Sequence, residues 1–208
     1  AGCAIVDDVA GTNLAGTRPP PTPPKANWQA APGFSASSLT KLAVIAEDKT
    51  RRSWGYEDAL VRSVEDQFIA RLLQKGYQVS ARSDVNRVME EIRFQQSGLT
   101  EAGAAKLGRM LNASAVLIVT INSASVNSRD TGWVVNGVPQ QQHTAVCNMS
   151  ARLISVEKAE ILGITTFTSG VSTSDRNDAS PAILFTARII AEAVPARNEQ
   201  PGAAPGNQ

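Results

Sequence analysis

The side chains that could do catalytic chemistry are few, and their spacing does not assemble a reactive site. His143 is the only histidine, so a zinc site or a Ser-His-Asp arrangement would have to form around this one imidazole. Glu90 and Glu91 are adjacent on a predicted helix, which points them about 100° apart and makes them a solvated pair rather than an acid–base couple. The sequence has no Gly-rich phosphate loop and no nucleophile elbow. We expect no enzyme, no cofactor and no metal site.

The neighbourhood of one cysteine points to a modification instead. Ala1-Gly2-Cys3-Ala4 resembles the end of a bacterial lipobox, in which the cysteine is acylated and heads the mature chain once the signal peptide is removed. Ala4, in the second mature position, fits sorting to the outer membrane. We expect Cys3 to carry lipid at the periplasmic face of the bacterial outer membrane; the alternative is an incidental thiol. Cys147 is expected to be a free, buried thiol.

The composition divides the chain into a folded part and two polar ends. Residues 1–3 are the lipobox remnant, and residues 4–40 contain a Pro-rich run, 17–24, that favours extended polyproline II, so we expect a disordered tether. Residues 195–208 contain almost nothing to bury and should form a disordered tail. One domain is expected over 41–194. The 20 basic and 19 acidic residues leave a net charge of +1, which does not favour nucleic acid.

The folded part alternates apolar patterns typical of strands with patterns typical of amphipathic helices. The pattern predicts an α/β (α+β) fold in the order β-α-β-α-α-β-β-β-α, with one mixed sheet of about five strands and helices packed on the sheet. Short connections favour an antiparallel meander for the last three strands, while helical crossovers join the first two. The expected strands are 41–46, 77–81, 115–121, 145–156 and 160–167, and the expected helices are 60–73, 83–94, 100–111 and 181–194.

Several short motifs along this order resemble those of one protein family. The motifs are Ala81-Arg82-Ser83-Asp84-Val85-Asn86, Ser97-Gly98-Leu99, Ala105-Lys106-Leu107-Gly108, Ala151-Arg152-Leu153-Ile154 and a hairpin over 153–162. Together they resemble the CsgG-type curli assembly and secretion lipoprotein family, with Ala159 where that family usually has glycine. The resemblance covers about residues 41–194 and implies the fold shared with the N-terminal domain of TolB. It also implies the architecture of LpoB, a lipoprotein activator of a peptidoglycan synthase that joins a lipid anchor, a Pro-rich tether and one such domain.

The resemblance also raises the possibility of a secretion pore, in which each subunit would contribute two membrane hairpins. A spanning strand needs about 9–11 residues, so each hairpin needs about 20 residues and a turn. The first window, 123–142, is a polar loop without sustained apolar alternation, and the second, 168–178, is polar and too short. We therefore rank a pore below the other functions.

Two surface features carry residue types that are common in binding sites. The first is a charged loop with Arg51, Arg52, Trp54 and Tyr56, because arginine and aromatic residues are enriched at interface hot spots. The alternative is a solvated loop whose aromatic residues pack against the start of the next helix.

The second feature is Trp133, which lies near Asn136-Gly137, a dipeptide suited to a tight turn. Trp133 would either contact a partner or the next subunit, or fold back onto the sheet.

These observations favour a non-catalytic scaffold or assembly factor for cell-envelope or secretion machinery, anchored in the outer membrane through Cys3. Its partner would be an envelope protein or its own subunits, with a homo-oligomer as one outcome. The alternative is an LpoB-like activator of a peptidoglycan synthase, and the third candidate is a pore subunit. The sequence does not name the partner.

Overall fold

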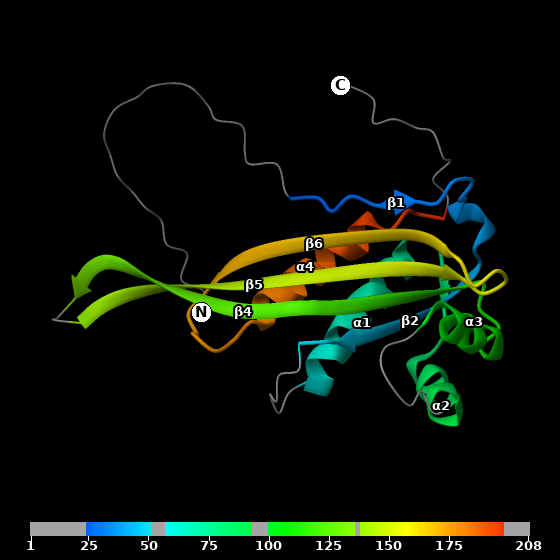
Figure 1. Cartoon of the computed structure of the whole chain (residues 1–208), viewed down its shortest axis with the longest axis horizontal. Helices are drawn as coiled ribbons and strands as arrows, with labels where there is room; N and C mark the ends of the chain where they lie inside the picture. The colour runs from blue at the N-terminus through cyan, green and yellow to red at the C-terminus, as the bar shows by residue number, and fades with distance from the viewer. Residues whose placement is uncertain (1–23, 51–56, 93–99, 136–137, 198–208) are drawn as a thin grey trace, which may run out of the picture.

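The computed structural model describes residues 24–50, 57–92, 100–135 and 138–197. Within these residues, one six-stranded sheet with strand order β1-β6-β5-β4-β2-β3 carries four α-helices (Figure 1). The strands are β1 Gln29–Ala30, β2 Lys41–Asp48, β3 Gln78–Val79, β4 Ala115–Val135, β5 Val138–Ser155 and β6 Ile161–Thr173. The helices are α1 Glu57–Gln74, α2 Arg82–Ile92, α3 Glu101–Met110 and α4 Ser180–Ala193, with a short 3-10 helix at Ala36–Ser38.

The sheet has the mixed topology that the sequence predicts. β2 is parallel to both of its neighbours, β3 and β4, and its pairing with β4 ends where Asp48 lies opposite Ile121. β4, β5 and β6 form an antiparallel meander. The sheet has six strands where we expected about five. The additional strand is β1, which pairs antiparallel with β6 and lies in the segment that the sequence prediction assigned to the tether.

The helices cover the two faces of the sheet unequally. α1 and α4 pack on one face, where Phe68, Leu72 and Ile190 are buried against β2, β4 and β5. α2 and α3 cover only one end of the other face (Figure 1). We call the part covered on both faces, residues 115–120 of β4 and 150–155 of β5 with their helices, the base. Burying each large apolar side chain contributes roughly 1.5–3 kcal/mol, so the stability of the fold is concentrated there.

α3 begins and packs in the way its sequence predicts. The Thr100 side chain caps the helix by accepting a hydrogen bond from the Gly103 amide at 3.2 Å. Gly108 approaches β5 so closely that a Cβ atom there would lie 2.1 Å from Val156 Cγ2. The Ala-Lys-Leu-Gly motif ends in glycine because the helix backbone lies directly on the sheet.

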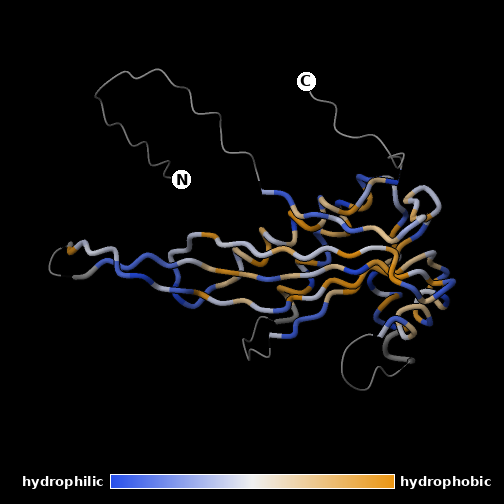
Figure 2. The backbone as a smooth tube through the Cα atoms, turned by 45° about the horizontal axis from the view of Figure 1, so that its top comes forward, coloured by the Kyte–Doolittle hydropathy of each residue, from blue (hydrophilic) through white to orange (hydrophobic). Residues whose placement is uncertain are grey.

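β4 and β5 continue well past the ends that the sequence predicts. β4 runs to Val135 and β5 begins at Val138, so the 123–142 window is a β-hairpin, and its prediction as a polar loop was wrong. Ala124 and Val126 still pack on the core, but beyond Val126 the period-two signal fails because most residues on both sides of the strand pair are polar and exposed. Figure 2 shows apolar colour at the helix-covered end and mostly hydrophilic colour along the hairpin.

Candidate functional site

The outer part of the β4–β5 hairpin extends beyond the rest of the sheet (Figure 1). β2 leaves β4 at Ile121, and β6 leaves β5 where Thr173 lies opposite His143. Beyond these points the described chain forms a two-stranded ribbon. We call residues 128–135 of β4 and 138–143 of β5 the arm.

Polar side chains bridge the two strands of the arm. The Ser128 Oγ and His143 Nδ1 atoms lie 2.7 Å apart, and the Gln141 amide donates to Asp130 Oδ1 at 3.1 Å. These two contacts join residues that lie directly opposite each other in the ladder. His143 therefore has a bonded partner within the arm, and its imidazole helps to hold the two strands together.

A bulge near the end of β4 sets the direction of Trp133. The register shifts between Asp130 and Val134, so that the extra residues of β4 lie opposite Gln140. Gly132 has φ +75°, a conformation that favours glycine, and the Thr131 hydroxyl donates to the Gln140 carbonyl at 2.8 Å. The amide of Trp133 in turn donates to Thr131 Oγ1 at 3.3 Å. Bulges of this kind re-aim the following side chain.

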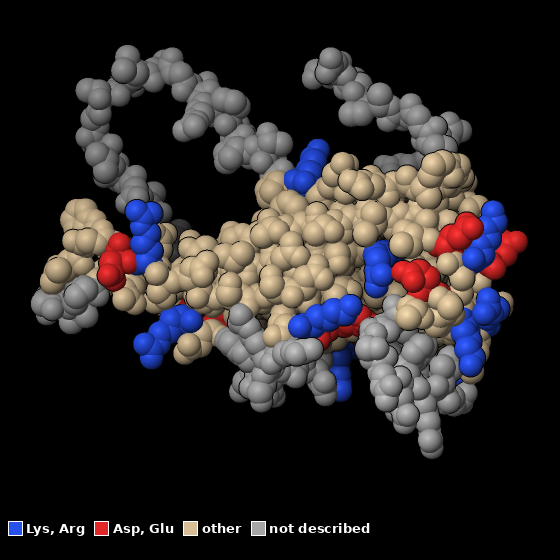
Figure 3. All heavy atoms as spheres, viewed as in Figure 1, with Lys and Arg blue, Asp and Glu red and all other residues tan. Residues whose placement is uncertain are grey.

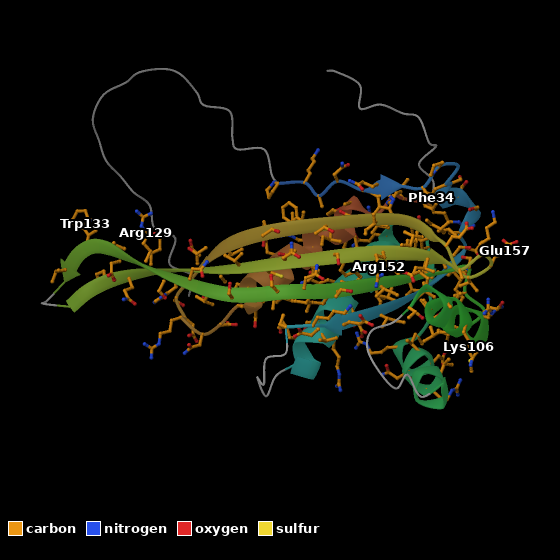
Figure 4. The ribbon with its side chains drawn as sticks, in the orientation of Figure 1. Phe34, Lys106, Arg129, Trp133, Arg152 and Glu157 are labelled. Atoms are coloured by element: carbon orange, nitrogen blue, oxygen red, sulfur yellow. The ribbon has the colours of Figure 1, made fainter. Side chains whose placement is uncertain are left out.

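The bulge leaves two apolar side chains in solvent at the end of the arm. Trp133 is 75% exposed and Val134 is 64% exposed. Figure 4 shows Trp133 extending from the end of the ribbon, with Arg129 nearer to the body. We expected Trp133 either to contact a partner or to fold back onto the sheet. In the structure it does not fold back onto the sheet. We call Trp133 and Val134 the tip.

A second accessible surface lies on the sheet itself, on the face that α2 and α3 leave uncovered. It is formed by Asn122, Ser123, Ser125, Asn148, Ser150, Thr166 and Thr168, all exposed or half-buried, and we call it the open face.

Side-chain hydrogen bonds cross the strands of the open face. The side-chain amide of Asn122 donates to Asn148 Oδ1 at 2.9 Å and to Ser150 Oγ at 3.2 Å. The side-chain amide of Asn148 donates to Thr168 Oγ1 at 2.7 Å. In the middle of this face Figure 3 shows almost no charged atoms.

Residues 24–39, which we call the strap, cover the edge of the sheet formed by β6. Gln29 and Ala30 pair with Ile164 and Gly163, and the Ala31 amide donates to the Leu162 carbonyl at 2.9 Å. A Cβ atom on Gly163 would lie 2.4 Å from the Trp28 ring, so the glycine makes room for the indole.

Sequence reasoning missed the strap because its few apolar residues follow a Pro-rich run. The isolated Trp28 was the signal that could have identified it.

The remaining predicted residues are placed as follows. Cys3, Arg51, Arg52, Trp54 and Tyr56 lie outside the described residues. Glu90 and Glu91 lie on α2. Cys147 is the buried free thiol that we predicted.

Burial raises the pKa of the Cys147 thiol from 9.0 to about 11, although a hydrogen bond with Thr186 opposes this shift. The thiol is therefore protonated and unreactive at neutral pH.

Two further searches of the described residues concern metal ligands and membrane-spanning helices. They contain no group of three or more His, Cys, Asp or Glu side chains that could hold a metal ion. None of the helices in the described part of the chain combines the length and apolar character that crossing a membrane requires.

Three solved structures are similar to this chain at low sequence identity. They are a PelC dodecamer from Paraburkholderia phytofirmans (15% identity, 83% of this chain and 98% of that chain, TM-score 0.48), lipoprotein GNA1162 from Neisseria meningitidis (13%, 71% and 94%, 0.49) and the LpoB C-terminal domain from Salmonella enterica (16%, 70% and 88%, 0.39). At these scores the likeness supports no conclusion about function. Comparison with curated proteins gave no match.

A family model provides the assignment that these structures do not. The model described as curli production assembly/transport component CsgG matches residues 41–201, which include every described strand except β1 and all four described helices. The matched range contains all the motifs on which the resemblance was based, which lie between Ala81 and Leu162. The chain belongs to the CsgG family.

Proposed function

We propose that this chain is a lipid-anchored, non-catalytic scaffold for assembly or secretion machinery of the bacterial envelope. Cys3 carries the lipid, the outer membrane holds the lipid, and the open face binds a protein, either another copy of the chain or an envelope partner. The non-catalytic role rests on the family description, which is of an assembly and transport component.

The observation that carries this proposal is the uncovered half of the sheet. The helix-covered face is filled by apolar side chains, whereas on the open face β4, β5 and β6 present hydroxyl and amide groups to solvent. Such groups can form hydrogen bonds to a protein partner without the desolvation cost of burying a charge. The outer edge of β4 past Ile121 lies beside this face without a pairing strand among the described residues. A neighbouring strand can therefore extend the sheet there.

The open-face proposal is tested by photo-crosslinking in cells. A photoreactive amino acid is placed at Thr168 on the open face and, as a matched control, at Ala70, which is exposed on α1. We expect the Thr168 variant to form a discrete crosslinked product and the Ala70 variant to form none. Absence of a product at Thr168, or equal products at both positions, would contradict the use of this face.

The anchor is tested separately by intact mass. Full-length precursor expressed in a lipoprotein-processing host should yield a mature chain that begins at Cys3 and carries acyl groups, and a Cys3→Ala variant should not. An unmodified Cys3 would contradict the proposed lipid anchor.

A second candidate is an activator of a peptidoglycan synthase. The Pro-rich run 17–24 favours it, because a long N-terminal segment would let the domain reach a partner some distance from the membrane. The same crosslinking experiment distinguishes the candidates. A product containing only this chain supports the self-assembling scaffold, and a product containing a synthase supports the activator.

A pore subunit ranks last. In the arm, Ser128, Arg129, Asp130, Gln141 and Gln142 place polar or charged side chains on both faces of the ribbon. A hairpin that spans a membrane needs a continuous apolar side towards the lipid. The arm would have to change its pairing register or its surroundings to provide one.

A further inference from the structure

A groove lies on the helix-covered side of the molecule, between the start of the strap and the C-terminal halves of α1 and α4. Its volume is about 570 Å³. Three segments that are far apart in the sequence each contribute one cation to its lining, namely Lys25 of the strap, Arg71 of α1 and Arg188 of α4. Glu192 is the only acidic residue among the described residues that line it. This surface, which we call the basic groove, is therefore positively charged although the whole chain has a net charge of only +1.

The floor of the basic groove is apolar. Ile189 and Ala26 both line the groove, and the first is buried while the second packs against the hydrophobic core. Cationic side chains thus surround an apolar surface. A ligand gains most from such a surface when it carries apolar atoms beside its negative charges, because it then removes apolar area from water as well as pairing charges.

One carboxylate is already held in the basic groove. The Arg71 guanidinium forms an ion pair with the Glu192 carboxylate across the gap between α1 and α4. Their side chains remain 37% and 44% exposed, so a carboxylate from another molecule can reach the same guanidinium. The groove therefore accommodates a carboxylate, and the planar fork of a guanidinium matches the geometry of that group.

The other cations near the groove are held by contacts that leave their charge available. Arg188 lies over the Phe185 ring, with its Cζ atom 5.2 Å from the ring centre, and this contact restricts the guanidinium without neutralising it. Lys75 donates to the carbonyl oxygens of Glu192, at 2.6 Å, and of Val194. These carbonyl groups lie at the end of α4 and would otherwise repel an anion, because the C-terminal end of a helix carries partial negative charge.

From these observations we infer that the basic groove binds a partner protein through an acidic segment in which carboxylate side chains lie beside apolar ones. Lys25 and Arg188 bind the carboxylates, and Ile189 contacts an apolar side chain of the segment. Arg71 exchanges Glu192 for a carboxylate of the partner. A small inorganic anion would leave the apolar floor unused. The inference goes beyond the proposed function, because the basic groove and the open face lie on opposite faces of the sheet and a neighbour on one leaves the other accessible.

The first test measures, by fluorescence anisotropy, how tightly the full chain binds a labelled peptide in which glutamate and leucine alternate. Lys25→Gln/Arg188→Gln removes two exposed cations from the groove, and the control Arg129→Gln/Arg176→Gln removes two exposed cations elsewhere, so both variants have the same net charge. We expect the groove variant to weaken binding at least about tenfold and the control less than about twofold, because salt screens distant charges. A peptide in which glutamate and serine alternate should bind more weakly, since it places nothing apolar on the floor.

The second test changes the affinity in the opposite direction. Glu192→Gln frees the Arg71 guanidinium and should tighten binding of the glutamate–leucine peptide by about threefold. The control is Glu157→Gln, which removes the same charge from an exposed position in the turn between β5 and β6 and should leave the affinity unchanged.

Equal weakening by the two double variants, or no tightening in Glu192→Gln, would overturn the inference. Displacement of the peptide by an equal concentration of inorganic phosphate would also overturn it, because the groove would then be a site for a small anion. These measurements are independent of the crosslinking at Thr168. A Thr168 product from a chain that does not bind the peptide would refute the basic groove alone.

Discussion

The two ends of the β4–β5 pair are held together in different ways. At the base, Val116, Leu117 and Ile118 are fully buried between two helical layers. In the arm, every residue of β4 from Asn127 to Val134 is exposed, and the strands are joined by their ladder and by polar side chains. The same two strands thus pass from a region that determines stability to one that contributes little to it. Side chains in the arm are consequently available for contacts with other molecules.

The largest expected difference between the two regions is in the effect of removing an aromatic ring. Phe68 has no exposed surface, so Phe68→Ala should lower the free energy of unfolding by about 3–5 kcal/mol through lost burial and a cavity. Trp133→Ala should change it by less than about 0.5 kcal/mol. Denaturant unfolding of the full chain followed by circular dichroism measures both. Similar losses in the two variants would show that the arm is part of the cooperative core.

A methyl group added at a glycine should sharpen the same contrast. Gly108→Ala places a Cβ atom against Val156 at the base and should cost about 2–3 kcal/mol of global stability. Gly132→Ala meets nothing within 4 Å, and its cost of about 1 kcal/mol comes from φ +75°. We expect that cost to appear only as faster amide exchange within the arm. A lower global midpoint for Gly132→Ala would contradict this separation.

Stability at alkaline pH should report on Cys147, which lies on β5 between the base and the arm. Burial raises the pKa of its thiol from 9.0 to about 11, so the folded protein holds the proton more tightly than the unfolded chain. This contribution to the free energy of unfolding is complete below about pH 9 and is lost as pH rises to about 11, and it amounts to about 3 kcal/mol in total. Cys147→Ala removes the titrating group. The free energy of unfolding of the parent chain should therefore fall more than that of the variant between neutral pH and about pH 10.5. Equal losses in the two proteins would contradict a buried thiol with a raised pKa.

The smallest effect is expected at the turn between β5 and β6, where Ala159 stands at a position at which the resemblance led us to expect glycine. Ala159 has φ 56°, a conformation that costs a residue with a side chain about 1–2 kcal/mol. Ala159→Gly should therefore stabilise the protein by about 1 kcal/mol, after the entropic cost of glycine is counted. Glu157→Gly, in the same turn but without a positive φ, is the control and should destabilise. Thermal unfolding distinguishes the two outcomes.

The base could be predicted from the sequence because its residues repeat with a clear period. Leu60, Val64 and Phe68 mark α1 at helical spacing, and the apolar run 115–121 marks the buried part of β4. Such patterns arise because burial on one side of a helix, or on both sides of a strand, selects the residue types.

The arm and the strap could not be predicted in the same way. Beyond Val126, β4 and the facing part of β5 pair with mostly polar side chains on both sides, so the sequence has no period-two pattern there. β1 contributes two residues to the sheet, and Gly163 on a distant strand provides the space that holds Trp28. Trp133 was identified as a candidate from its residue type, but its exposure depends on the bulge at Gly132, which only the paired structure reveals.

Hydrogen exchange of the full chain tests the central contrast between base and arm most directly. We predict that amides of the base, such as those of Val116–Val119, exchange only by global unfolding, while arm amides exchange faster through local opening. Arm amides that exchange as slowly as those of the base would contradict an arm that contributes little to the stability of the fold.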